Sequence, residues 1–215
     1  MFAARRLPSG IVPRRSHLTI EPITLEGRHV RLDPLSLSHQ EALVRASTDG
    51  ELWTLPYTVV PSKETIFEYI SKTLQAQEQG LEQPFAIVDM HRSAIVGSTR
   101  YTRIDAENRQ REIGYTWLAR SVQRTAINTE AKYLLLRHAF EDCGCIRVEF
   151  MTDILNERSR AAILRIGAKQ EGILRNHMIM PNGRYRDSVC FSIIESEWPI
   201  VKESLIARLD RARVE

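Results

Sequence analysis

Residues 156–194 read NERSRAAILRIGAKQEGILRNHMIMPNGRYRDSVCFSII and carry the clearest pattern in the chain. Asn156 is a favoured N-cap residue, apolar residues then recur at helical spacing, and Gly167 ends the run. The dipeptide Asn182-Gly183 favours a tight turn between an apolar stretch over 173–180 and a stretch in which apolar and polar residues alternate. The predicted order is therefore helix, strand, tight turn, strand.

Outside this unit, strands are interleaved with helices. The expected strands are 28–35, 85–88, 94–102, 112–118 and 146–152, and the expected helices are 38–50, 61–80, 128–142 and 198–209. Within the strand over 112–118, the residues Ile113, Tyr115 and Trp117 are expected on one face. Strands interleaved with helices, followed by a hairpin, predict a mixed α/β sheet in a single domain.

The composition is that of a globular protein. The 215 residues are 43% hydrophobic and 27% charged, and no run approaches eighteen apolar residues, so no membrane span is expected. The formal net charge of +3 is uneven, because the first 20 residues hold four arginines and no acidic residue. The rest of the chain is close to neutral, which argues against a nucleic-acid partner.

Three segments follow from these patterns. Residues 1–18 are rich in arginine and broken by proline and glycine, which predicts a flexible basic arm; an organelle transit peptide and a mis-assigned start are the alternatives. Residues 19–195 form the predicted domain, and residues 196–215 form a helix packed on it. That helix either covers the core or pairs two copies in a homodimer, and the sequence leaves both open.

The cysteines indicate the compartment. An odd number, three, in a chain long enough to fold without disulfides indicates a reducing environment, so we expect a cytoplasmic protein. Cys143 and Cys145 have no cluster of histidine or cysteine at zinc-ligand spacing. No metal is expected.

Several residues of the C-terminal half agree in order and spacing with a known family. They are Asn156, Ser159, Gly167, Glu171-Gly172, Arg175-Asn176-His177 and 183–188. This order resembles the GNAT superfamily of acetyl-CoA-dependent N-acetyltransferases, and most of all the branch that acetylates the N-terminal alanine or serine of ribosomal proteins. The resemblance covers about residues 18–205 and is densest after residue 110.

The resemblance implies a fold and an activity. The expected fold is a single α/β domain with a mixed, mostly antiparallel central sheet and helices on both faces. The expected reaction is direct transfer of an acetyl group from acetyl-CoA, the co-substrate, to a primary amine on a protein N-terminus or a small molecule. A GNAT-like module that holds an acyl-CoA without turnover is the alternative.

Two groups of residues are cofactor candidates. Backbone N–H groups at a helix N-terminus form an anion site, so a pyrophosphate is expected at the turn before the helix over 128–142. This turn comprises Gln123, Arg124, Thr125, Ala126, Ile127 and Asn128. Arg124 stands where the family often has glycine, and an ordinary strand-to-helix turn is the alternative. The resemblance also implies that Asn156 binds the pantetheine arm and that Ser159 lies near its thiol, although an N-cap alone explains this pair.

Two residues compete as the general base. Glu112 lies on the strand where the family often places a catalytic carboxylate, and His177 lies on the strand after Gly167 with an ordinary pKa near neutrality. A surface ion pair of Glu112 with Arg111 or Arg100 and a structural role for His177 are the alternatives. A base matters more for a lysine acceptor, of pKa about 10.4, than for an α-amino group of pKa about 8.

The remaining candidates complete the site. Ser159 and Tyr185 compete as the acid that protonates the leaving thiolate, and the phenol of Tyr185 has the more suitable pKa. The fold implies that a backbone N–H near Trp117 and Leu118 holds the negative charge that develops on the carbonyl oxygen. The aromatic loop over 51–57, with Trp53 and Tyr57, is expected to line the acceptor side or to form a hydrophobic lid.

Overall fold

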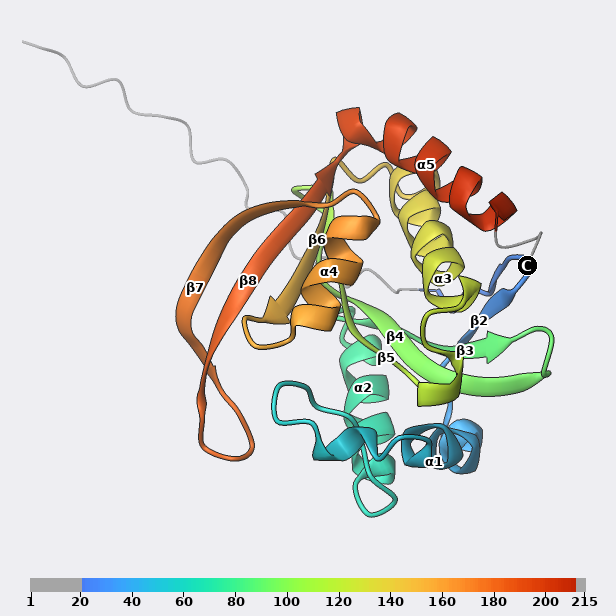
Figure 1. Ribbon diagram of the computed structural model, residues 1–215, viewed down its shortest axis with the longest axis vertical. Helices are drawn as coiled ribbons and strands as arrows, with labels where there is room; N and C mark the ends of the chain where they lie inside the picture. The colour runs from blue at the N-terminus through green and yellow to red at the C-terminus, as the bar shows by residue number, and fades with distance from the viewer. Residues whose placement is uncertain (1–20, 212–215) are drawn as a thin grey trace, which may run out of the picture.

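The computed structural model describes residues 21–211, so the predicted arm over 1–18 lies outside the described residues. The centre is one sheet of eight strands in the order β1-β2-β3-β4-β5-β6-β8-β7 (Figure 1). The strands are β1 (Leu25–Glu26), β2 (Val30–Pro34), β3 (Gln83–Asp89), β4 (Ala94–Asp105), β5 (Gln110–Leu118), β6 (Arg147–Asp153), β7 (Lys169–Ile179) and β8 (Tyr185–Ile194). All neighbours pair antiparallel except β5 and β6.

Five α-helices within residues 21–211 surround the sheet. They are α1 (Gln40–Thr48), α2 (Ile66–Glu78), α3 (Ala126–Arg137), α4 (Glu157–Arg165) and α5 (Trp198–Arg211). Figure 1 shows α3 and α5 on one side of the central strands and α1 and α2 on the other. The expected mixed sheet with helices on both faces is therefore confirmed. Trp198 of α5 stacks on Phe140 just after α3, with ring centroids 5.4 Å apart.

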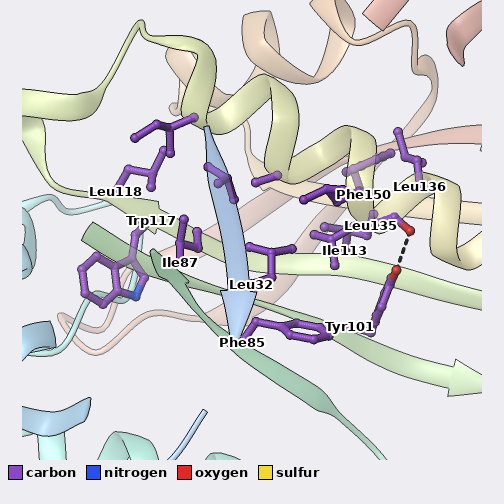
Figure 2. Packing of buried hydrophobic residues seen from close by; sticks show 14 of the residues in the cluster. Leu32, Phe85, Ile87, Tyr101, Ile113, Trp117, Leu118, Leu135, Leu136 and Phe150 are labelled. Carbon is purple, nitrogen blue, oxygen red and sulfur yellow. Dashed lines mark hydrogen bonds between the residues drawn. The ribbon is translucent and has the colours of Figure 1, made fainter. Parts of the chain in front are cut away.

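The core between the sheet and α3 is built from alternate strand residues. Figure 2 shows Leu32 and Ile113 from the sheet facing Leu135 of α3, and all three are buried. The hydroxyl of Tyr101 donates to the carbonyl oxygen of Leu135, as the dashed line marks. Burying such side chains contributes about 1.5 to 3 kcal/mol each, which fixes α3 against β4 and β5.

The helix and hairpin predicted from residues 156–194 are present. The side-chain oxygen of Asn156 accepts a hydrogen bond from the backbone N–H of Ser159 at 3.0 Å, so Asn156 caps α4 as expected. Gly183 has φ of 79°, in the left-handed region that a tight turn requires. Strand β7 begins at Lys169, earlier than the predicted residue 173, because its pairing with β8 extends to Ser192.

The prediction that Ile113, Tyr115 and Trp117 share a face is wrong. Tyr115 has φ of 49°, and between Gly114 and Trp117 strand β5 contains one residue more than β4, which is a β-bulge. The bulge resets the alternation, so Ile113 lies beside Leu135 while Trp117 lies on the opposite side of the strand from Leu118 (Figure 2).

The only parallel pairing among the described strands is short. Strands β5 and β6 pair at Gln110 with Arg147, at Arg111 with Val148 and at Glu112 with Glu149. Past this last pair, β5 continues along β4 and β6 continues along β8, so the two strands part. Each strand then has one backbone edge without a neighbouring strand, and this parting positions the candidate site.

Candidate active site

The turn between β5 and α3 is held by its own side chains. The side-chain amide of Gln123 donates to the carbonyl oxygen of Leu118 at 3.0 Å, which ties the turn to the end of β5. The hydroxyl of Thr125 donates to the carbonyl oxygen of Val122 at 2.7 Å and accepts from the backbone N–H of Ile127 at 3.3 Å. Thr125 is therefore the N-cap, and α3 begins two residues before the predicted Asn128.

Backbone donors remain available in this turn. Arg124 has φ of 64°, so it adopts the left-handed conformation for which glycine is the usual residue, and its side chain is exposed. Within residues 21–211, no acceptor is found for the backbone N–H groups of Arg124, Thr125 or Ala126. Free N–H groups at the N-terminus of a twelve-residue helix suit an anion such as a pyrophosphate.

A buried lysine, which the sequence analysis missed, lies at the parting of β5 and β6. Lys132 of α3 donates from Nζ to Thr116 Oγ1 at 2.6 Å, and Nζ lies 5.7 Å from the ring centroid of Phe150. Burial lowers the pKa of Lys132 to about 7, although the charge of Glu112 opposes the shift. The only signal in the sequence was a lysine flanked by the apolar positions of α3.

Glu112 lies on the other side of the sheet, at the last residue pair that β5 shares with β6. Its carboxylate reaches over Gly114, since a Cβ added there would lie 2.9 Å from Glu112 Oε1. Its charged partner is Arg103, with Nε 3.4 Å from Oε2, so the predicted alternatives Arg111 and Arg100 are not its partners. Burial raises the pKa of Glu112 to about 6, against the opposing charge of Arg103.

His177, the second candidate base, shares these surroundings. A register shift in β7 gives Asn176 φ of 47°, and its backbone N–H donates to Asp187 Oδ1 at 2.7 Å. His177 Nδ1 lies 3.0 Å from the hydroxyl oxygen of Ser188. Burial lowers the pKa of His177, and the charges of Arg103 and Arg186 lower it further. The same two arginines act on Glu112, so the structure brings both candidates to one cluster.

Other predicted residues lie around this parting. Asn156 and Ser159 are half-buried at the N-terminus of α4, which follows β6, and the amide oxygen of Asn156 is used by the cap. Trp117 is buried, and its indole N–H has no hydrogen-bond partner among the described residues. Leu118 is buried at the end of β5. Tyr185 is 65% exposed at the start of β8, and no hydrogen bond of its hydroxyl group to another described residue is found.

The aromatic loop is tied to the β7–β8 hairpin. Trp53, in the short 3-10 helix Leu52–Thr54, and Tyr57 are half-buried. The carbonyl oxygen of Pro56 accepts from a guanidinium nitrogen of Arg184 at 3.4 Å. Arg184 also forms an ion pair with Asp153, whose side chain is fully buried at the end of β6. One arginine thus joins the loop, the hairpin turn and β6.

A second arginine, Arg100, is held between two aromatic rings on the side of the sheet that faces α2. The guanidinium of Arg100 lies 4.1 Å from the ring centroid of Tyr115 and 5.0 Å from that of Tyr69 on α2. Its Nη1 also pairs with Glu82 at 2.5 Å. These contacts hold the bulged residue Tyr115 against α2.

No group of three or more His, Cys, Asp or Glu side chains in residues 21–211 is arranged to hold a metal ion. None of the helices in that part of the chain combines the length and hydropathy needed to span a bilayer.

Comparison with known proteins identifies the family. Residues 29–169 match the family described as "Acetyltransferase (GNAT) domain". The Bacillus subtilis protein YdaF, provisionally named a ribosomal N-acetyltransferase, is 34% identical over 109 residues, which cover 51% of this chain and 58% of YdaF. The chain therefore spans little more than half the length of that relative.

Solved structures share the architecture. A GCN5-related N-acetyltransferase from Brucella melitensis is 33% identical with a TM-score of 0.80, over 89% of this chain and 87% of that one. Mycobacterium smegmatis RimJ, solved in complex with CoA-disulfide, is 23% identical with a TM-score of 0.75, over 87% of this chain and 95% of that one, and shows the shared fold. By sequence and structure, the chain belongs to the GNAT family of N-acetyltransferases.

Proposed function

We propose that the protein transfers the acetyl group of acetyl-CoA directly to a primary amine at the parting of β5 and β6. The observation that carries this proposal is the arrangement at Glu112. The strands separate just past its pair with Glu149, a turn with free N–H groups lies on one side, and a buried carboxylate lies on the other. The CoA-disulfide in the RimJ structure, a protein of the same fold, supports the choice of cofactor.

The residues present fit acetyl-CoA. The N–H groups of Arg124, Thr125 and Ala126 would bind its pyrophosphate, and the guanidinium of Arg124 is exposed beside them. The open backbone edges of β5 and β6 would pair with the amides of its pantetheine arm. The amide nitrogen of Asn156 is not used by the cap and would bind the arm near the α4 N-terminus. When bound, acetyl-CoA supplies an activated acetyl group.

We assign the general base to Glu112. With a pKa raised to about 6, its carboxylate is ionised at neutral pH yet basic enough to accept a proton from an ammonium group. An α-amino group, of pKa about 8, gives up that proton far more readily than lysine. His177 is the alternative base, because it lies beside the same two arginines.

Two further roles complete the proposal. The bulge leaves Tyr115 and Thr116 out of register with β4, just before the predicted Trp117 and Leu118. Backbone N–H groups of this segment would stabilise negative charge on the carbonyl oxygen. Ser159, at the α4 N-terminus, and Tyr185, on the hairpin, remain the proposed proton donors to the thiolate.

The proposed acceptor is the N-terminus of a protein, bound on the α1/α2 side against the loop with Trp53 and Tyr57. The similarity to YdaF, whose name specifies ribosomal N-acetylation, supports this choice over a small-molecule amine. The half-buried aromatic loop, tied to the hairpin through Arg184, offers a fixed wall on that side.

Thiol release from acetyl-CoA tests the proposal, with three peptides of one sequence as acceptors. The first has free α-amino and lysine groups, the second a blocked α-amino group, and the third a blocked lysine. We expect release with the first and third, and mass spectrometry should place the acetyl group on the N-terminus. Binding of acetyl-CoA without thiol release for any peptide or small-molecule amine would favour the non-catalytic module.

A further inference from the structure

Lys132 is a buried cation that the proposed reaction does not use. Only 6% of its surface is exposed, and its ammonium contacts side chains of both strands that part there. Nζ donates to Thr116 Oγ1 on β5 at 2.6 Å and lies 5.7 Å from the ring centroid of Phe150 on β6. Both residues follow Glu112 and Glu149, the last pair that joins β5 to β6. The ammonium therefore lies on the α3 face of the sheet, where β5 and β6 part.

The hydrogen bonding of this ammonium is incomplete. An ammonium has three N–H donors, and Thr116 Oγ1 is the single acceptor found for it within residues 21–211. That oxygen is also shared with Thr99 Oγ1, 2.7 Å away. The ring of Phe150 attracts the charge but accepts no ordinary hydrogen bond. A buried charged donor without an acceptor is costly, so two N–H groups of Lys132 favour a ligand oxygen.

The charges nearby do not supply that oxygen. Glu112 acts on Lys132 electrostatically, but it lies on the opposite face of β5 and pairs with Arg103. Glu149 on β6 accepts from Arg147 instead. From β8, Arg186 acts on Glu112 and donates to Ser188.

Distance along α3 identifies which part of the ligand would supply it. Lys132 lies six residues after Ala126, the first residue of the helix, or about 9 Å along its axis. Phosphates bound at the N-terminal turn are therefore remote from Nζ. An acyl-pantetheine arm, which enters the gap between the strands, carries amide and thioester carbonyl oxygens and no charge.

We propose that Lys132 binds a carbonyl oxygen of the acyl-pantetheine arm, donating to it one of the N–H groups for which residues 21–211 supply no acceptor. The inference rests on the proposed function, because it requires acetyl-CoA in this gap. It makes Lys132 a cofactor-binding residue on the α3 side, distinct in role from Glu112 on the acceptor side.

A consequence is uptake of a proton on binding. Before binding, the pKa of Lys132 is lowered to about 7, so at pH 8 the amine is mostly neutral. A carbonyl acceptor favours the charged form and raises this pKa. Binding at pH 8 should therefore draw a proton from the buffer, and affinity should fall as pH rises from 7 to 9.

Calorimetric titration with acetyl-CoA at pH 8, in two buffers of different ionisation enthalpy, measures this uptake. We expect the wild type to take up a large fraction of a proton, and Lys132→Met to take up none and to bind about tenfold or more weakly. Glu112→Gln and Thr116→Val should both retain the uptake, since each keeps the lysine. Lys132→Met binding with wild-type affinity and uptake would overturn the inference and leave the proposed function standing.

Two further outcomes are decisive. If the wild type binds no acetyl-CoA, the proposed function fails and this inference fails with it. If Lys132→Met does not fold, as circular dichroism would show, the wild type and Glu112→Gln carry the test. An affinity that is independent of pH from 7 to 9 in both would overturn the role of Lys132.

Discussion

The two faces of the sheet differ most where β5 and β6 part. On the α3 face, the buried ammonium of Lys132 donates a hydrogen bond to a threonine hydroxyl and lies near an aromatic ring. On the α1/α2 face lies a cluster in which Glu112 and His177 share the charges of Arg103 and Arg186. Among residues 21–211, the α3 face offers the Lys132 ammonium a single hydrogen-bond acceptor, whereas the other face carries charges of both signs.

This difference indicates that the two faces have different functions. A buried site with unused donors suits a ligand arm that brings neutral carbonyl groups, as pantetheine does. A carboxylate with a pKa of about 6, beside an exposed arginine, suits a step in which a proton leaves an amine. We infer that the cofactor binds from the α3 side and the acceptor from the α1/α2 side.

The largest expected effect comes from removing the carboxylate of Glu112 on the α1/α2 face, where the amine is proposed to bind. Glu112→Gln should lower kcat by about 10²- to 10⁴-fold, because the amide cannot accept a proton. The fall in wild-type rate below about pH 6 should also vanish, since the pKa of Glu112 is raised to about 6. Steady-state rates across pH measure both.

Two matched variants sharpen this test. Glu149→Gln alters a neighbouring carboxylate that accepts from Arg147, and it should change kcat little. If His177→Gln removes the rate while Glu112→Gln leaves it intact, the base is His177 and its assignment to Glu112 is wrong.

The next effect concerns the loop with Trp53 and Tyr57, which Arg184 ties to the hairpin. Arg184→Met should lower the free energy of unfolding by about 3 to 5 kcal/mol, because the carboxylate of Asp153 is fully buried and would lose its partner. Arg147→Met is the control, since its partners Glu149 and Glu171 are 27% and 41% exposed and can remain solvated, so its loss should cost about 1 kcal/mol. Equal losses in urea unfolding would show that Arg184 does not anchor this loop.

Part of this picture could be predicted from sequence because it rests on local rules. The cap at Asn156 and the turn at Gly183 follow from neighbours within a few residues, and both are confirmed. A turn between a strand and a helix was expected at 123–128 and is present, and Arg124 in it adopts the left-handed conformation that favours glycine.

The remainder depends on contacts between distant segments. The bulge at Tyr115 arises from the register with β4, which strict alternation cannot foresee. Lys132 is buried because two strands part beneath it, and Arg184 reaches Asp153, 31 residues away. Glu112 pairs with Arg103 across a neighbouring strand rather than with Arg111 beside it. Such pairings are set by topology, so composition and spacing carried no signal for them.

A third effect tests the bulge that separates the two faces. A Cβ added at Gly97 would lie 2.1 Å from the carbonyl oxygen of Trp117, so β4 and β5 approach closely there. Gly97→Ala should lower the free energy of unfolding by about 1 to 3 kcal/mol. Gly172→Ala is the control, because nothing lies within 4 Å of its added Cβ. If the two variants have the same denaturation midpoint, β4 and β5 can move apart at Gly97 without loss of stability.

The last effect, of similar size, is a pH dependence of stability. The pKa of Glu112 is about 6 in the folded protein, above its ordinary 4.5. Protonated Glu112 therefore stabilises the fold below pH 4.5, and this contribution is lost as pH rises through 6. Relative to Glu112→Gln, the wild type should lose about 2 kcal/mol of unfolding free energy over this range. A constant difference between the two proteins would contradict a buried, raised pKa.

Amide hydrogen exchange tests the division between the faces most directly. With acetyl-CoA we expect protection of the backbone around Arg124–Ala126 and along the edges of β5 and β6 past Glu112, with little change around Trp53 and Tyr57. A peptide with a free N-terminus, added to the CoA complex, should then protect the loop with those two aromatic residues. Protection of that loop by acetyl-CoA alone, with none at the α3 turn, would contradict the account.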